Sequence, residues 1–151
     1  MKLGFFGIDQ LNFVEFNITG DDSNYQKLSE ESKYLGSEVF NLFAHCFEKS
    51  NDLYEYYEPT KFNSRKIIVL RNELVKNLFN LNKIDKQEIF SNFINNIFLG
   101  KAFLSEIEKS DIHWQKNWEE YLNKLKLLNK EMINIIDKCV EDGRVFWIIG
   151  Y

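Results

Sequence analysis

The sequence has few of the residues that metal sites, disulfide frameworks and phosphate-binding loops require. Its two cysteines, Cys46 and Cys139, and its two histidines show none of the recurring spacings of structural zinc ligands, and the single proline is Pro59. Seven scattered glycines form neither a P-loop nor a dinucleotide-binding fingerprint. Polar residues interrupt the longest uncharged stretch, 89–100, and the apolar run 3–8 is too short for a signal peptide. We therefore expect no membrane span, metal or cofactor, and a cytoplasmic location.

Length and composition are those of one globular domain. Of the 151 residues, 44% are hydrophobic and 28% are charged, which excludes a disordered chain. A chain of this size buries about 70% of its unfolded surface, enough for one hydrophobic core. No repeat or linker divides it, so residues 1–151 are predicted to form a single domain.

Charge is distributed unevenly along the chain. Residues 1–60 contain eleven acids and four bases, a net charge of −7, whereas residues 61–151 carry +3. A negative surface repels phosphates, which argues against nucleic acid as a ligand. It suits a basic protein partner, although a mildly acidic surface also serves solubility.

Two hydrophobic periods predict the secondary structure. Apolar residues recur at helical spacing over residues 25–49, 64–81, 85–100 and 111–140. Gly100 ends or bends the third helix, Asp85 and Glu88 resemble a capping box at its start, and Asp111 is the expected N-cap of the last.

Short apolar or alternating segments at both ends of the chain predict strands. Residues 3–8 and 12–18 are expected to form a hairpin that turns at Asp9 and Gln10, and residues 144–149 a C-terminal strand. The predicted class is α+β and mostly helical, with about four helices packed with a small sheet formed by the N-terminal hairpin and the C-terminal strand.

Catalytic residues have no recognisable arrangement. His45 adjoins Cys46, but neighbours on a helix project about 100° apart, which disfavours a shared metal ion. His113 follows Asp111 at a predicted helix start, and no serine occupies a nucleophile elbow. The aromatic stripe of Trp114, Trp118 and Tyr121 is more typical of core than of a ligand pocket. A non-enzymatic protein is the prediction, and an enzyme acting through either histidine is the least favoured hypothesis.

The most unusual local composition occurs in residues 48–59, which we call the acidic tyrosine segment. Four acids and three tyrosines occur within these twelve residues. Tyrosines are frequent at binding hot spots, and surrounding carboxylates orient a basic partner. The same tyrosines could instead cover the core between two helices. The predicted partner-binding residues are Asp52, Tyr54, Glu55, Tyr56, Tyr57 and Glu58.

This segment resembles the toxin-facing segment of colicin-type nuclease immunity proteins, in which acids precede a tyrosine pair and a proline. The matching residues are Asp52, Leu53, Tyr56, Tyr57 and Pro59, with Glu58 interposed before the proline. The resemblance is confined to this segment and implies a bacterial immunity protein that neutralises a basic toxin by occlusion. The alternative is a small-molecule or lipid-binding domain with an aromatic pocket between the last helix and the sheet. Oligomeric state is left open.

Overall fold

The computed structural model describes residues 1–7 and 12–151. Within them the chain forms six helices and a four-stranded antiparallel sheet. The strands are β1 (Phe13–Asn17), β2 (Lys33–Gly36), β3 (Thr60–Phe62) and β4 (Phe146–Gly150). The helices are α1 (Ser37–Phe40), α2 (Ala44–Ser50), α3 (Lys66–Asn82), α4 (Gln87–Asn95), α5 (Gly100–Ser110) and α6 (Trp118–Glu141). The α+β class is therefore confirmed.

The sheet has the order β2-β1-β4-β3, which places the two central strands far apart in sequence. Glu15 in β1 lies opposite Tyr34 in β2 and Ile149 in β4. The predicted hairpin of residues 3–8 with 12–18 is wrong in its pairing. Phe6 instead forms an isolated bridge with Tyr34, and β1 pairs with β2 and β4. The predicted turn at Asp9 and Gln10 lies outside the described residues.

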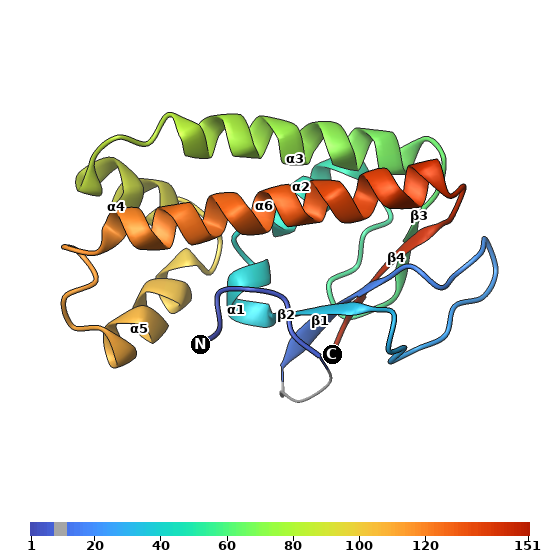
Figure 1. The fold of residues 1–151 in the computed structure, drawn as a ribbon, viewed down its shortest axis with the longest axis horizontal. Helices are drawn as coiled ribbons and strands as arrows, with labels where there is room; N and C mark the ends of the chain where they lie inside the picture. The colour runs from blue at the N-terminus through green and yellow to red at the C-terminus, as the bar shows by residue number, and fades with distance from the viewer. Residues whose placement is uncertain (8–11) are drawn as a thin grey trace.

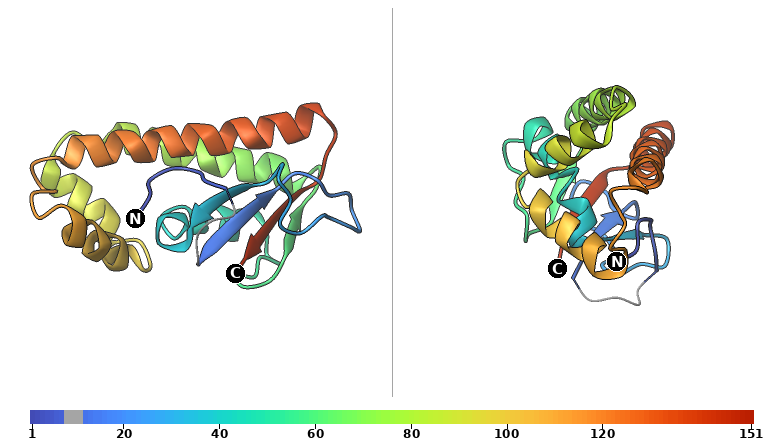
Figure 2. Two further views of the ribbon diagram at one scale, coloured as in Figure 1. Left: turned by 60° about the horizontal axis from the view of Figure 1, so that its bottom comes forward. Right: turned by 90° about the vertical axis from the view of Figure 1, so that its left-hand side faces the viewer.

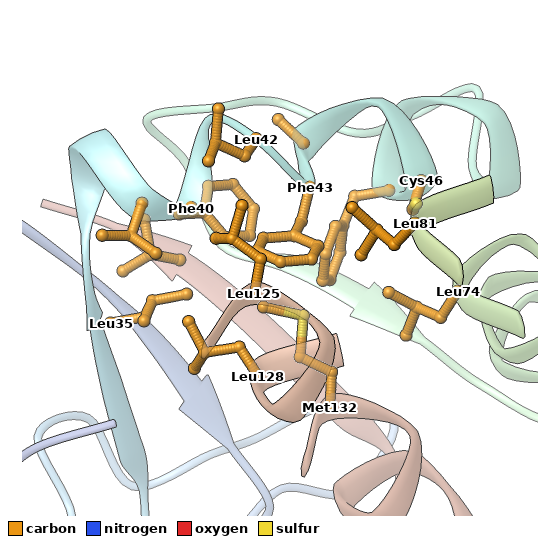
Figure 3. Close-up of a cluster of buried hydrophobic side chains, with 14 of the residues drawn as sticks. Leu35, Phe40, Leu42, Phe43, Cys46, Leu74, Leu81, Leu125, Leu128 and Met132 are labelled. Carbon is orange, nitrogen blue, oxygen red and sulfur yellow. The ribbon is translucent and has the colours of Figure 1, made fainter. Parts of the chain in front are cut away.

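Helices cover one face of the sheet. The long helices α3 and α6 lie side by side, and α4 and α5 lie at the end away from the sheet (Figures 1 and 2). In the core, Leu125, Leu128 and Met132 of α6 lie near side chains of α1, α2 and α3 (Figure 3). Among the helices described, none combines the length and the apolar character that crossing a bilayer would require.

The prediction of about four helices was wrong at two places. The helix expected over 25–49 is replaced by β2, α1 and α2, because residues 33–36 pair with β1 and Gly36 has the extended backbone ψ of 139°. The helix expected from residue 85 is two helices, α4 and α5; the break predicted at Gly100 is present, and Leu99 before it has a left-handed φ of +64°. The first outcome depends on pairing with a distant strand, which local periodicity does not report.

Helix starts also differ from those predicted. The N-cap of α4 is Lys86, without a side-chain capping bond, so the capping box at Asp85 is not formed. Helix α6 begins at Trp118 rather than near Asp111. Asp111 instead stabilises the preceding turn: its carboxylate accepts from the His113 amide at 2.9 Å and the Tyr121 hydroxyl at 2.9 Å. The predictions of α3, α6 and β4 were otherwise correct to within a few residues.

Glu15 is fully buried on the sheet face opposite the helices. Its Oε1 accepts from Asn17 Nδ2 at 2.9 Å and from Ser32 Oγ at 2.7 Å. Its Oε2 accepts from the Leu28 amide at 3.2 Å and from the Tyr151 hydroxyl at 2.7 Å. A buried carboxylate is costly unless such donors surround it. The network ties β1 to residues 28–32 and to the end of β4.

Removing this carboxylate should destabilise the protein. We expect Glu15→Ala to lower the free energy of unfolding by about 3 kcal/mol or more, because buried donors lose their acceptor. Tyr151→Phe, which removes one partly exposed donor, should cost about 1 kcal/mol. Urea unfolding followed by circular dichroism measures both. Tyr57→Phe is the matched control, since that hydroxyl is on an exposed side chain; equal stability of all four proteins would contradict the assigned role of Glu15.

Candidate functional site

The acidic tyrosine segment joins the end of α2 to β3, and its side chains divide into two groups. Tyr54 and Tyr56 are half-buried, whereas Tyr57 is 78% exposed. The acids of the predicted partner-binding set are also exposed; they are Asp52, Glu55 and Glu58. The structure therefore presents one tyrosine and three carboxylates on the surface and uses the other two tyrosines partly for packing.

Tyr54 and Tyr56 pack against the core. The Tyr54 ring lies 6.2 Å from that of Phe47, and the Tyr56 ring 6.1 Å from that of Phe40. The Tyr56 hydroxyl donates to Asn41 Oδ1 at 2.6 Å. Burial is the main cause that raises the pKa of both hydroxyls. Changes at either tyrosine would disturb the fold, so Tyr57 is the tyrosine that tests binding alone.

Beside this segment lies a cleft of about 800 Å³, within the size range of ligand-binding pockets. It is lined by α1, α2, α3, the α4–α5 turn, Tyr56, Tyr57 and Tyr151. The cleft thus lies apart from the last helix, where the alternative hypothesis placed its aromatic pocket. The lining is more apolar than polar, and five asparagines supply polar groups to it: Asn12, Asn41, Asn77, Asn80 and Asn96.

Two glycines lie against or beside two segments of the cleft lining, which we call its walls. The tyrosine wall, Tyr56 and Tyr57, lies against Gly150, where an added Cβ would come within 1.9 Å of the Tyr56 carbonyl oxygen. The phenylalanine wall, Phe98 and Leu99, precedes Gly100, where an added Cβ would come within 1.8 Å of the Ile94 carbonyl oxygen. Only glycine permits these close approaches. The backbone positions of both walls therefore depend on these two glycines.

Ionisable groups give the cleft a negative character. Glu38 and Glu48 line it together with one cation, Lys49. The pKa of His45 lies below its ordinary value, mainly because burial disfavours the charged ring and secondarily because Lys49 is near. His45 therefore adds no positive charge at neutral pH, and its Nδ1 is buried without a hydrogen-bond partner among the described residues.

His45 and Cys46 lie closer together than their helical spacing suggested. The Cys46 Sγ is 3.5 Å from His45 Nε2 and 3.7 Å from the Glu73 carbonyl oxygen. Burial raises the pKa of the Cys46 thiol to about 12, so the protonated thiol persists at neutral pH, whereas nucleophilic catalysis needs the thiolate. His113 is exposed and distant in sequence from these groups. Among the described residues, no cluster of three or more acidic, cysteine or histidine side chains could hold a metal ion.

Sequence reasoning missed half of this site. It identified the tyrosine wall but not Glu38, Asn77 or the phenylalanine wall. The only local signal was Phe98 and Leu99 before Gly100, the glycine that was predicted to end or bend the helix. Phe98 is 85% exposed, which is unusual for a large apolar side chain and marks it as a candidate for binding. The aromatic stripe is packed against the core, as predicted: Trp114, in the turn before α6, is buried, and Trp118 and Tyr121 of α6 are partly buried.

Comparison with known proteins gives no relative: no family model, curated protein or solved structure matches the chain.

Adding a methyl group at either wall glycine should disturb the cleft. We expect Gly100→Ala and Gly150→Ala each to lower the free energy of unfolding by about 1–3 kcal/mol, because a backbone carbonyl must move. Gly4→Ala is the matched control, since a Cβ there meets nothing within 4 Å. Chemical denaturation measures the cost, and amide NMR shifts at residues 56–57 and 94–99 report the movement. Wild-type stability in both variants would show that the walls are not constrained in this way.

Both thiols should be unreactive in the folded protein. Burial raises the pKa of Cys139 to about 11, and Cys46 is more strongly affected. We expect Ellman's reagent at mildly alkaline pH to modify neither thiol in native protein and both thiols after denaturation. Rapid modification of one equivalent in the native state would instead reveal an accessible thiolate and reopen the enzyme hypothesis.

Proposed function

We propose that this protein is a non-enzymatic protein-binding module that neutralises a basic partner, most specifically a bacterial immunity protein that occludes a toxin such as a nuclease. The observation that carries the proposal is the placement of Tyr57 among three exposed carboxylates, at the edge of a cleft with two constrained walls. Those carboxylates belong to Asp52, Glu55 and Glu58.

The exposed acids are available for a partner. Asp52, Glu55 and Glu58 make no ion pair with any residue that the structure describes. They belong to the part of the chain whose net charge is −7. Unpaired carboxylates of one sign accelerate the approach of a basic surface and orient it. The exposed Tyr57 ring then offers apolar area and a hydroxyl at the centre of that surface.

Occlusion needs no chemistry from this chain. A nuclease must present positive charge to bind its phosphate substrate. A protein that covers this positive surface with carboxylates competes directly with the substrate. The bacterial immunity role is also what the resemblance of residues 52–59 implies, and the acidic side chains of that segment are exposed as such a role requires.

A second candidate function is the binding of a small molecule in the cleft. Its volume of about 800 Å³ favours this candidate. The asparagine-rich lining suits a polar ligand better than a lipid. Native and denaturing mass spectrometry of the purified protein distinguish the two functions, because a resident small molecule adds mass only under native conditions.

Neutralising the exposed acids and removing the Tyr57 ring should weaken partner binding without unfolding the protein. The variant combines four changes: Asp52→Asn, Glu55→Gln, Tyr57→Ala and Glu58→Gln. Loss of one tyrosine hot spot alone costs about 2 kcal/mol, so we expect affinity to fall by about 30-fold or more. The partner is captured from lysates of the host and related strains, identified by mass spectrometry, purified and measured by calorimetry.

A matched control changes charge and aromatic content equally at exposed sites elsewhere. It carries Phe79→Ala, Asp85→Asn, Glu119→Gln and Glu141→Gln, all at exposed positions. The control should bind like wild type, and wild type should inhibit the activity of the purified partner in proportion to the complex formed. Equal affinities of the two variants, or capture of an acidic partner alone, would contradict the proposed function.

A further inference from the structure

Two carboxylates in the cleft have no cationic partner. Glu38 comes from α1 and is half-buried, and Glu48 comes from α2. Neither forms an ion pair within the described part of the chain, and the same holds for Lys49, the single cation of the lining. The net charge of the lining is therefore negative, and a concave surface concentrates that field.

The other ionisable groups around the cleft do not offset this charge. His45 is neutral because its pKa is lowered by burial and by Lys49, although Asn77, Glu48 and Glu73 act in the opposite direction. Burial raises the pKa of Tyr56. Burial and the hydrogen bond to Glu15 raise the pKa of Tyr151. The titratable groups facing the cleft thus leave the negative charge of its lining in place at neutral pH.

Hydrogen-bonding groups and aromatic rings accompany the carboxylates. The side chains of Asn12, Asn80 and Asn96 line the cleft and make no hydrogen bond to another described residue. Their amide oxygens are available as acceptors. Tyr57 and Phe98 expose most of their rings, one on each wall. Acceptors around flat rings complement a planar cation with several N–H donors.

From this combination we infer that the cleft receives one arginine side chain of the partner, with the guanidinium between the Glu38 and Glu48 carboxylates and the rings of Tyr57 and Phe98 beside it. The inference rests on the proposed function and names the group that the partner inserts. Arginine fits better than lysine because its planar group donates five hydrogen bonds in fixed directions and stacks on rings. A basic partner is what the exposed acids outside the cleft also favour.

Other occupants fit less well. A phosphate-bearing ligand would face two carboxylates with one lysine to balance them. A purely apolar group would remove water from those carboxylates without replacing its hydrogen bonds, which is costly. The guanidinium of arginine can donate hydrogen bonds to both carboxylates, and its methylene groups can pack against the apolar parts of the walls.

The probe for this inference is N-acetyl-arginine amide, titrated into ¹⁵N-labelled full-length protein at constant ionic strength and neutral pH. We expect saturable shifts at Glu38, Glu48, Tyr57 and Phe98 and in the asparagine side-chain amides of the lining. The neutral isostere N-acetyl-citrulline amide should cause none of them, because it lacks the charge. Absence of shifts, shifts elsewhere, or equal shifts from citrulline would each overturn the inference.

Charge-neutralising variants separate the cleft from the rest of the surface. Glu38→Gln with Glu48→Gln should weaken arginine binding by about tenfold or more, since two charge-assisted contacts are lost. Glu119→Gln with Glu141→Gln, at exposed positions of α6 outside the cleft lining, should leave it unchanged. If a captured partner binds the variant with Glu38→Gln and Glu48→Gln as tightly as wild type, the arginine inference is refuted while the proposed function stands. Arginine binding without any protein partner would refute the proposed function and retain the cleft chemistry.

Discussion

The buried carboxylate of Glu15 gathers four donors from three separate parts of the chain. The strand that carries it pairs with β2 and β4, and the donors come from β1 itself, from residues 28–32 and from Tyr151. Because the group is fully buried, its free energy depends on all of these donors being in place. The segment before β2 and the end of β4 are therefore positioned together. Tyr151 also lines the cleft, so the network reaches the candidate site directly.

The position of β4 in turn determines one wall of the cleft. Gly150 is the residue before Tyr151, and its missing side chain allows the Tyr56 carbonyl to approach. Gly100 does the same for the phenylalanine wall through Ile94, on elements that share few contacts with the sheet. The two walls are thus held by independent constraints. A cleft whose walls are already in place loses less conformational entropy when it is filled, which favours binding even where few groups interact.

Elements stabilised by contacts between residues close in the sequence could be predicted, whereas those that depend on distant residues could not. Helices α3 and α6 bury regular apolar stripes, and β4 is a β-branched and aromatic run, so local patterns sufficed. Residues 25–36 carry a similar apolar spacing, yet the Leu28 amide donates to Glu15 and Lys33 pairs with Phe16. Such partners cannot be identified from spacing alone. The cleft was beyond prediction for the same reason, because its two walls are about forty residues apart in the sequence and the tyrosine wall depends on the distant Gly150.

The two candidate functions differ in which acidic side chains they would use, those inside the cleft or also those outside it. A small molecule in the cleft would use Glu38 and Glu48 and leave Asp52, Glu55 and Glu58 in water, where they repel one another and stabilise nothing. A protein partner would cover both groups at once, because the tyrosine wall belongs to the same segment as the outer acids. Part of the repulsion within the acidic half of the chain would then be relieved on binding, which adds to affinity and to the stability of the complex. The proposed basic protein partner would engage the segment and the cleft together.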